Sequence, residues 1–447
     1  MKAVVRVTSS HVLERWDVKH ILARTWHRPQ QQLRPIGEVA VRRSESSPSG
    51  LRLGSIHFDG TMSLRPAGAS LKGRSFVAHP GDVVFSKIDV RNGAIGVVPD
   101  AHGSLAFSAE YPIYDVRSPG QLLPEYMRLL CRTEVFRSQV EALVVGHSGR
   151  KRVAPELFET LTIPVPDLAE QERIVRTEQE ALKRIAELQS ALQSVPEEGI
   201  REVTQLLGLS ATDAAPIRFP FVVDSGRMGS WSVPGAVHTA RGVPTTLTSD
   251  YPILPLGDLA TVSYGLQKSP ANRPGPNARP YLRVANVQNG YFDLTEIKQI
   301  DVAPDSVEMY LLQPGDVLLC EGNSAELVGR PALWDGQIPG CVHQNHVLRV
   351  RTDRDQLLPE YLLAYMQTVP ARSHFRRRAK KTTNLATINS TDVRELAIPL
   401  PSLPDQEKIA DLWAGVQAQV RDAREKVRKE EAQLKRHLEK MISDGSV

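Results

Sequence analysis

Several residue patterns that mark common classes of protein are missing from this 447-residue sequence. No apolar run approaches the roughly 18 residues that cross a bilayer, and the first residues lack the continuous apolar segment of a secretory signal. Cysteine is scarce, because only Cys131, Cys320 and Cys341 occur and none forms a CxxC pair. An odd number of unpaired cysteines suits a reducing compartment, so we expect a cytoplasmic protein without a membrane.

Motifs of the common enzyme classes are also missing. The sequence contains no P-loop GxxxxGK[ST], no GxSxG, no HExxH and no GxGxxG. His343 and His346 lie three residues apart, but no further ligand follows at a metal-site spacing, so structural histidines are the favoured interpretation. We therefore expect no catalytic residue, no metal and no cofactor in this chain.

Length and charge set the remaining limits. A chain of 447 residues with 41% hydrophobic and 24% charged residues predicts a globular protein of two or three domains. Its net charge of +4 permits a polyanionic partner without requiring one, so the places where charge gathers carry more information.

What the sequence does contain is a long internal repeat. With one ungapped shift of 235 residues, "QLLPEY" at 121–126 recurs at 356–361 and "LTIPVPDLAEQERI" at 161–174 resembles "LAIPLPSLPDQEKI" at 396–409. Farther upstream, "HPGDVVFS" from His79 resembles "QPGDVLLC" from Gln313 after a small drift in register. Such a period is far longer than that of a solenoid, so the chain is a tandem duplication of one unit.

The repeated unit combines strands with helices. Apolar runs after the Pro-Gly turns predict strands, and the "LLPEY" segments predict amphipathic helices with proline in the first turn. Because proline donates no ladder hydrogen bond, "IPVP" and "IPLP" are expected to be edge strands or extended segments that lead out of each domain. The fold class is therefore α+β, a duplicated β-rich domain followed each time by a helix.

Each exit segment leads into a helix with a narrow apolar stripe. The stripe predicts a coiled coil, because all other faces carry mixed charge and the seam needs a partner helix. The first helix is expected to be the shorter one and to stop near Pro196. The seam residues expected between the two helices are Ile174, Ile185, Leu188, Val416, Val427 and Leu434.

These patterns divide the chain into five segments. We expect a first β-rich domain over residues 1–169, a first helix region over 170–208, an irregular connector over 209–250, a second β-rich domain over 251–404 and a second helix over 405–447.

Basic residues gather at the same place in both copies, between the "LLPEY" helix and the exit segment. The sequences are "GHSGRKR" at 146–152 and "RSHFRRRAKKTTN" at 372–384, and both are interpreted as loops. Their equivalent placement favours contact with nucleic acid phosphates over an ordinary solvated loop. The candidate phosphate-binding residues are Arg150, Lys151, Arg152, Arg372, Arg376, Arg377, Arg378, Lys380 and Lys381.

Two β-rich units, each closed by an "IPxPxLxEQxxI"-like junction and a helix, resemble the specificity (S) subunit of type I restriction-modification systems. The junctions, the two "PGDV" turns and the two "LLPEY" helix starts carry the resemblance, which covers most of the chain from about Leu33. It implies a non-catalytic subunit in which each β-rich unit is a target recognition domain that reads one half of a bipartite sequence in double-stranded DNA.

The same resemblance implies partners. The helices would pair antiparallel as a spacer and receive two DNA methyltransferase (M) subunits, which hold S-adenosylmethionine and methylate adenine. Restriction (R) subunits would join where the complex cleaves DNA. Both an ordinary type I enzyme and a related phage-defence system built on this scaffold fit the sequence.

Base reading is expected from loops near the "PGDV" strands. Arginine and lysine suit guanine, asparagine and glutamine suit adenine, and glutamate accepts from cytosine. The candidates are Lys87, Arg91 and Asn92 in the first domain and Glu321, Asn323, Ser324, Gln344 and Asn345 in the second. Two other classes stay open, a coiled-coil scaffold whose β domains bind proteins and a stand-alone enzyme that modifies nucleic acid.

Overall fold

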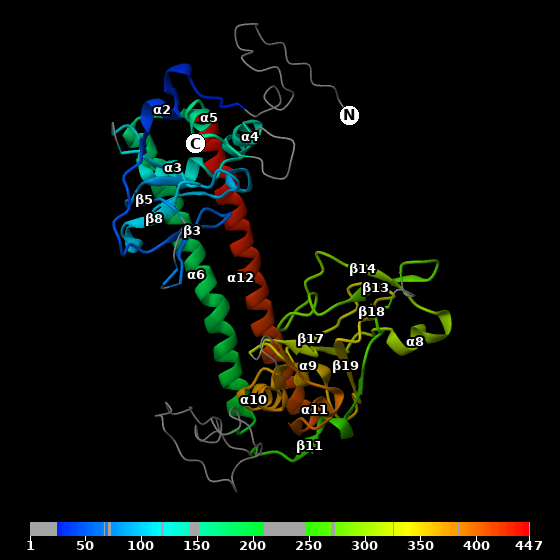
Figure 1. Ribbon diagram of the computed structural model, residues 1–447. Helices are drawn as coiled ribbons and strands as arrows, with labels where there is room; N and C mark the ends of the chain where they lie inside the picture. The colour runs from blue at the N-terminus through cyan, green and yellow to red at the C-terminus, as the bar shows by residue number, and fades with distance from the viewer. Residues whose placement is uncertain are drawn as a thin grey trace. The chain divides into compact units, whose positions relative to one another are not determined.

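The protein was analysed as a computed structural model that describes residues 25–66, 68–69, 73–117, 120–143, 152–209, 247–269, 273–324, 326–381 and 385–446. The chain forms two compact units (Figure 1). Unit 1 comprises Met1–Leu188 with Lys426–Val447, and unit 2 comprises Gln189–Glu425. Each of two long helices contributes residues to both units.

Unit 1 contains the first β-rich domain. Its strands are β1 (Leu33–Pro35), β2 (Val41–Arg43), β3 (Gly54–Ile56), β4 (Met62–Leu64), β5 (Ser75–Ala78), β6 (Val83–Phe85), β7 (Ile95–Val97), β8 (Leu105–Ser108), β9 (Ile113–Asp115) and β10 (Thr162–Pro164). Its helices are η2 (Gln30–Gln32), α2 (Ile36–Val39), η3 (Val90–Asn92), η4 (Asp100–His102), α3 (Pro124–Leu130), α4 (Glu134–Ala142), α5 (Pro155–Glu159) and the start of α6 (Leu168–Leu206).

Unit 2 contains the second β-rich domain. Its strands are β11 (Ile253–Pro255), β12 (Ala260–Ser263), β13 (Ala278–Leu282), β14 (Lys298–Asp301), β15 (Val317–Cys320), β16 (Gly322–Asn323), β17 (Pro331–Leu333), β18 (Val342–His343), β19 (Val347–Thr352), β20 (Lys380–Lys381), β21 (Ala386–Thr387) and β22 (Ala397–Pro399). Its helices are η6 (Leu256–Asp258), η8 (Pro304–Ser306), α8 (Val307–Tyr310), α9 (Pro359–Tyr365), α10 (Val369–Arg378), α11 (Ser390–Arg394) and the start of α12 (Leu403–Asp444).

Each domain contains its own four-stranded central sheet, and the two sheets have equivalent strand orders. In the first domain the strand order is β2-β9-β6-β7, and in the second it is β12-β19-β15-β17, which is the same order element by element. Outside this sheet the domains differ. The first carries the antiparallel pairs β3-β4 and β5-β8, whereas the second carries the sheets β14-β13-β18 and β16-β21-β20. The predicted α+β duplication is confirmed. The two copies have the same central sheet order and differ in the smaller sheets outside it.

In each domain, a two-stranded antiparallel ribbon pairs the first strand with the exit segment. β1 pairs antiparallel with β10, with Leu33 opposite Pro164, and β11 pairs with β22, with Ile253 opposite Pro399. The exit prolines therefore lie on short edge strands, where a missing N–H group leaves no ladder bond unmade.

A buried glutamine holds each long helix to its own domain. In the first copy, Gln171 Oε1 accepts from the N–H of Leu123 at 2.9 Å, while its Nε2 donates to the carbonyls of Gln121 and Pro166, both at 2.8 Å. In the second copy, Gln406 makes the same three bonds at positions shifted by 235 residues, to Leu358, Gln356 and Pro401. Both glutamines are 0% exposed. One amide therefore joins the "LLPEY" helix, the exit segment and the start of the long helix.

The tyrosine of each "LLPEY" segment reinforces this junction. Tyr126 and Tyr361 are buried, and their hydroxyls donate to the carbonyls of Pro164 and Pro399. The first "LLPEY" helix, α3, is short: it ends at Leu130, and Thr133 then begins a second helix, α4, by accepting from the N–H of Phe136.

The aspartate of each "PGDV" turn is also structural. Asp82 accepts from the N–H of His79 and is ion-paired with Arg43, and Asp316 accepts from the N–H of Gln313 and is ion-paired with Arg351. Each aspartate thereby fixes the turn that enters the central strand of its sheet.

The first long helix does not stop at Pro196. α6 runs unbroken from Leu168 to Leu206, and the prediction of an early end is wrong. A proline inside a helix removes one hydrogen bond. Burial beyond it compensates, because Val203 and Leu207 are both 0% exposed in the hydrophobic core of the second domain.

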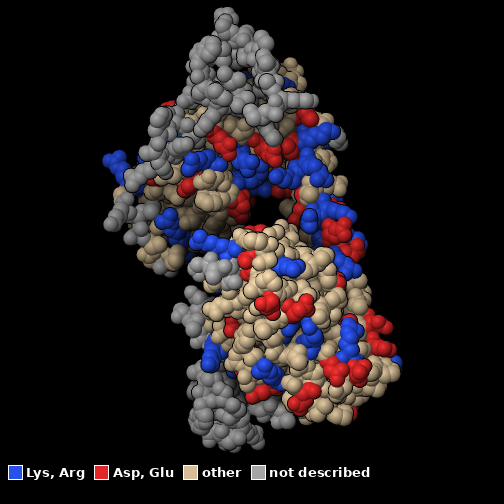
Figure 2. Space-filling view, turned by 90° about the vertical axis from the view of Figure 1, so that its right-hand side faces the viewer, with Lys and Arg blue, Asp and Glu red and all other residues tan. Residues whose placement is uncertain are grey.

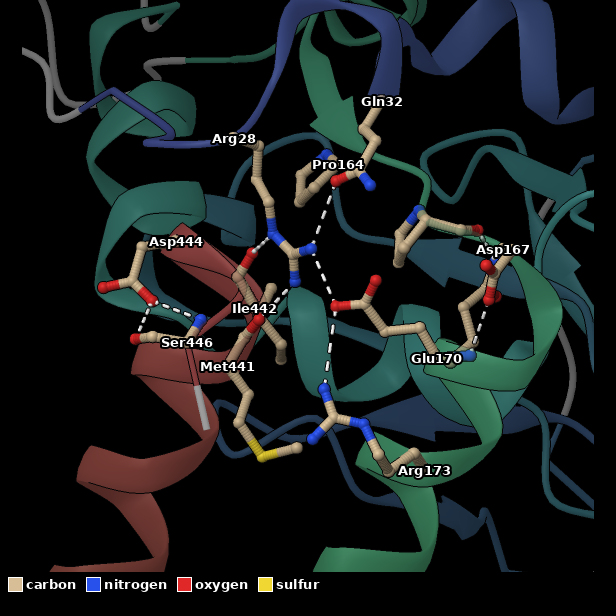
Figure 3. Close-up of polar contacts among 12 residues, drawn as sticks. Arg28, Gln32, Pro164, Asp167, Glu170, Arg173, Met441, Ile442, Asp444 and Ser446 are labelled. Atoms are coloured by element: carbon tan, nitrogen blue, oxygen red, sulfur yellow. Dashed lines mark hydrogen bonds and ion pairs between the residues drawn. The ribbon is translucent and has the colours of Figure 1, made fainter.

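Within unit 1, α6 and the end of α12 lie side by side and antiparallel (Figure 1). Arg184 of α6 is ion-paired with Glu430 of α12 at 3.7 Å. Two residues before the start of η2, Arg28 bridges the C-terminal end of α12 and the N-terminal end of α6 (Figure 3). Its guanidinium donates to the last carbonyls of α12, at Met441 and Ile442, and to Glu170 in the first turn of α6. A cation at a helix C-terminus and a carboxylate at an N-terminus both complement the helix dipoles.

Within unit 2 the two helices approach closely at a glycine. A Cβ atom on Gly199 of α6 would lie 2.5 Å from the Val416 side chain and 3.3 Å from the Trp413 ring of α12, so only glycine fits. The second domain also contacts α12 through a turn, where Arg424 stacks 3.8 Å over the Tyr291 ring and Gln417 donates to the Gly290 carbonyl at 3.0 Å. Across the described ranges, no helix has the length and apolar character needed to cross a membrane.

The buried glutamine predicts a stability effect. Replacing Gln406 with alanine leaves one N–H and two carbonyl groups without their partner, and an unsatisfied buried polar group costs about 1–3 kcal/mol. We expect Gln406→Ala to lower the melting temperature and to speed amide hydrogen exchange at Leu358, whose acceptor is lost. Glu407→Ala, one residue farther along and exposed, is the matched control. Unchanged exchange at Leu358 would show that this amide is not what holds the helix start.

Candidate nucleic-acid interface

The first domain brings three polar residues together where its central strands end. The N–H of Lys87, just after β6, donates to the Glu110 carbonyl at 3.1 Å, and the N–H of Val153 donates to the Lys87 carbonyl at 2.8 Å. Arg152 is ion-paired with Glu110 at 3.4 Å, and Lys87 Nζ donates to the Ala109 carbonyl at 2.7 Å. A predicted phosphate-binding residue and a predicted base-reading residue therefore share one edge.

Of the other first-domain candidates, two lie in a short helix and two lie outside the described residues. Arg91 and Asn92 lie in η3, where Arg91 is half-buried and exposed Asn92 donates to Asp89 at 3.4 Å. Arg150 and Lys151 lie outside the described residues.

The second domain brings four segments to the corresponding edge. The N–H of Glu321 donates to the His346 carbonyl at 3.0 Å, and their side chains form a hydrogen bond of 2.6 Å between His346 Nδ1 and Glu321 Oε2. The N–H of Ile388 donates to the Glu321 carbonyl at 2.9 Å, and that of Asn345 donates to the Leu266 carbonyl at 3.0 Å. Asn323 lies on β16, opposite Ala386 of β21.

The remaining base-reading candidates border this edge. Ser324 is exposed directly after β16, and Gln344 and Asn345 are half-exposed between β18 and β19. The five second-domain candidates thus lie in two segments, 321–324 (which includes β16) and 344–345, and these segments come together at the Glu321–His346 pair.

The basic stretch of the second domain is not the loop that the sequence suggested. Its arginines lie on α10, because Ala371 and Phe375 recur at a helical spacing and are both 0% exposed. Arg376, Arg377 and Arg378 fill the last turn of this helix, where positive charge complements the helix dipole. Lys380 and Lys381 form β20, which pairs with β21.

These cations differ in how far they are buried and in the groups to which they are bonded. Arg372 donates to Asn289 and to the Glu326 carbonyl, and burial lowers its pKa. Burial also lowers the pKa of Arg377, which is half-buried. Arg378 is ion-paired with Glu395 and lies 3.9 Å from Asp392. Arg376 and Lys380 are exposed, so they are the cations best placed to meet a phosphate.

On the face of the second domain that Figure 2 shows, charge is mixed. In the view of Figure 2, Lys and Arg side chains of the second domain lie among Asp and Glu with uncharged surface between them. On this face, neutralisation of a polyanion would therefore depend on particular cations rather than on a broad patch.

The predicted seam residues lie along both long helices. Ile174 belongs to the core of the first domain with Met441 and Ile442 of α12, and Val416 belongs to the core of the second. Ile185 and Val427 are buried, whereas Leu188 and Leu434 are half-buried. The seam therefore merges at each end with a domain core, which the helical spacing alone did not reveal.

The cysteine and histidine side chains, which could support catalysis, pack or bond within the fold. Burial raises the pKa of Cys131 and of Cys341 to about 12, and it raises the pKa of Cys320 as well, so these thiols stay protonated. Among the described residues, no group of three or more His, Cys, Asp or Glu could hold a metal ion. The two neighbouring histidines differ, because His343 is buried against the Val347 carbonyl whereas His346 is exposed beside Glu321.

Comparisons with known proteins find similar chains and one matching family model. The family model for the type I restriction modification DNA specificity domain matches residues 249–419. The putative type I restriction enzyme MjaX specificity subunit of Methanocaldococcus jannaschii is 29% identical over 134 residues, which cover 30% of this chain and 32% of that protein. The type I restriction enzyme EcoKI specificity subunit of Escherichia coli (strain K12) is 22% identical over 334 residues, which cover 74% of this chain and 66% of that protein.

A solved structure shares the fold. It is described as "Structural basis underlying complex assembly and conformational transition of the type I R-M system", and one of its chains aligns with a TM-score of 0.55 at 18% identity. The alignment covers 92% of this chain and 97% of that chain, so it includes both β-rich domains and both long helices.

Buried His343 predicts a dependence of stability on pH. Burial lowers its pKa from 6.5 to about 4, so between these values the unfolded chain binds a proton that the folded chain does not. Stability should therefore fall as the pH falls from 6.5 towards 4. His343→Asn keeps an N–H donor for the Val347 carbonyl but cannot titrate, and the melting temperature should then vary less with pH over this range. Gln344→Ala, which leaves His343 in place, should retain the original dependence, and an equal dependence in all three proteins would contradict the assignment.

Proposed function

We propose that the chain belongs to the family of type I restriction-modification specificity subunits, that it reads a bipartite DNA target, one half with each β-rich domain, and that it directs partner methyltransferase subunits to this target. One observation carries the proposal. The two domains share the central strand order and the glutamine junction but differ in their marginal sheets, as two readers of unlike half-sites would.

The long helices supply the spacer in this proposal. α6 has 39 residues and α12 has 42, so at ~1.5 Å per residue each extends about 60 Å. One turn of duplex DNA is roughly 34–36 Å, and helices of this length suit half-sites a turn or more apart.

Partner docking follows from the duplication. The junctions around Gln171 and Gln406 present equivalent elements, and two copies of one partner can bind two equivalent surfaces. We propose two methyltransferase subunits there, which would hold S-adenosylmethionine and carry out the chemistry, with restriction subunits joining for cleavage. This chain would contribute sequence recognition and geometry, and no catalytic group.

A first test concerns the exposed cations. Substituting alanine for both Arg376 and Lys380 should weaken DNA binding and reduce the slope of log K against log salt concentration by up to ~0.9 for each lost phosphate contact. Arg378→Ala is the matched control on the same helix, because this arginine is already ion-paired with Glu395. Equal slopes for the double variant and the unmodified protein, measured by fluorescence anisotropy, would exclude these residues as phosphate contacts.

A second test concerns the helix seam in unit 1. Ile185 and Val427 are both buried on the paired helices, and fully burying such a side chain contributes roughly 1.5–3 kcal/mol. Ile185→Asp with Val427→Asp should separate the helices and abolish methyl transfer to a bipartite site. Leu182→Asp, on the exposed side of α6, should be tolerated. Full assembly by light scattering together with full activity in the double variant would mean that the helix pair is not the spacer.

A further inference from the structure

We propose that three structurally equivalent positions in each domain, here called the reading triplet, determine which bases that domain reads. The triplet is Lys87, Glu110 and Arg152 in the first domain and Glu321, His346 and Thr387 in the second. Glu110, His346 and Thr387 are the new members, since no sequence pattern marks them as DNA-contacting residues. This inference rests on the proposed function, because it assigns roles within a DNA-reading domain.

Identical backbone hydrogen bonds establish the equivalence. The N–H of Lys87 donates to Glu110 as that of Glu321 donates to His346, at 3.1 and 3.0 Å. The residue after Arg152 donates to the Lys87 carbonyl as the residue after Thr387 donates to the Glu321 carbonyl, at 2.8 and 2.9 Å. Two backbone bonds therefore place three side chains in one frame, twice in the same chain.

The side-chain charges at equivalent triplet positions indicate which part of the DNA these positions contact. Lys87 in one domain is replaced by Glu321 in the other, and Glu110 is replaced by His346. Phosphates carry the same charge at every base pair, so a position that binds phosphate has no reason to reverse its sign. Base edges differ in their donors and acceptors, so a position that reads bases must vary with the target. The reversal therefore favours contact with base edges.

The Glu321–His346 pair indicates a particular contact. A carboxylate only accepts, so His346 Nδ1 carries the proton in their 2.6 Å bond. In the neutral ring Nε2 is then an acceptor on a side chain that is 56% exposed. The major-groove groups that donate to such an acceptor are the amino groups of adenine N6 and cytosine N4. Glu321 acts as the positioning residue that fixes the ring.

The first-domain triplet has a different chemistry. Arg152 and Lys87 present donors, which suit the O6 and N7 acceptors of guanine, and Glu110 presents a carboxylate that accepts from cytosine N4. Arg152 and Glu110 have exposed side chains, at 52% and 43%, so a base edge can reach both. The two half-sites should therefore differ at the base pairs that the two triplets contact.

The experiment selects DNA from a library randomised in both half-sites, using the full chain assembled with its methyltransferase partners, and sequences the methylated products. His346→Ala should relax the preference at one base pair of one half-site roughly ten-fold and leave the other half-site unchanged. Glu110→Ala should do the same in the other half-site. Glu321→Gln, which still offers an acceptor to Nδ1, should retain the preference that Glu321→Ala loses. Glu308→Ala, on exposed α8, is the control outside the triplet.

The outcomes separate the two proposals. An unmodified complex without any base preference would overturn the proposed function and this inference together. An unmodified complex that reads both half-sites, combined with unchanged preferences in His346→Ala and Glu110→Ala, would overturn the reading triplet alone. His346→Gln serves as a second variant at the exposed position, and circular dichroism checks that each variant is folded.

Discussion

A single buried side-chain amide at the start of each long helix sets the geometry on which the other parts depend. Gln171 and Gln406 each satisfy one N–H and two carbonyl groups at the point where the "LLPEY" helix, the exit strand and the long helix meet. Both glutamine side chains are 0% exposed, so a lost bond would leave a buried amide unsatisfied, and the helix start is held in the direction that completes all three bonds. The sequence repeat, with its shift of 235 residues, thus reflects the same three hydrogen bonds at the start of each long helix.

The same constraint explains which parts of the domains differ. The partners of the buried amide lie in the segments that follow central-sheet strands β9 and β19 and ribbon strands β10 and β22, so these strands must keep their geometry. The marginal sheets hold none of these hydrogen-bond partners, and they are where β3-β4 and β5-β8 give way to β14-β13-β18 and β16-β21-β20. Divergence is therefore confined to the elements that can change without redirecting the long helix.

Much of this architecture follows from sequence and some of it does not. The repeat, the strands after "PGDV" and the proline-bounded exits are local patterns, and each forms as expected. The sequence predicts too early an end for α6, because the penalty of Pro196 is offset by burial of Val203 and Leu207 in a core assembled from residues far away in the chain. The sequence predicts a loop for the basic stretch of the second domain, because the burial of Phe375 that makes it a helix is a tertiary contact. Positions such as Glu110 and His346 carry no motif, and only matching backbone bonds reveal them.

The separation of buried and exposed roles bears on why two unlike domains occur in one chain. Two copies of a single-domain chain, related by a two-fold axis, would present the same side chains at both ends and would read a symmetric target. Joining the copies lets each domain change its exposed residues alone. Residues that direct the helices, such as Gln406 and Tyr361, are wholly buried, whereas His346 and Arg152 are exposed and bonded mainly within their own edge. A substitution at that edge can therefore alter what one domain reads while the direction of both helices, and with it the surface offered to the partners, stays the same.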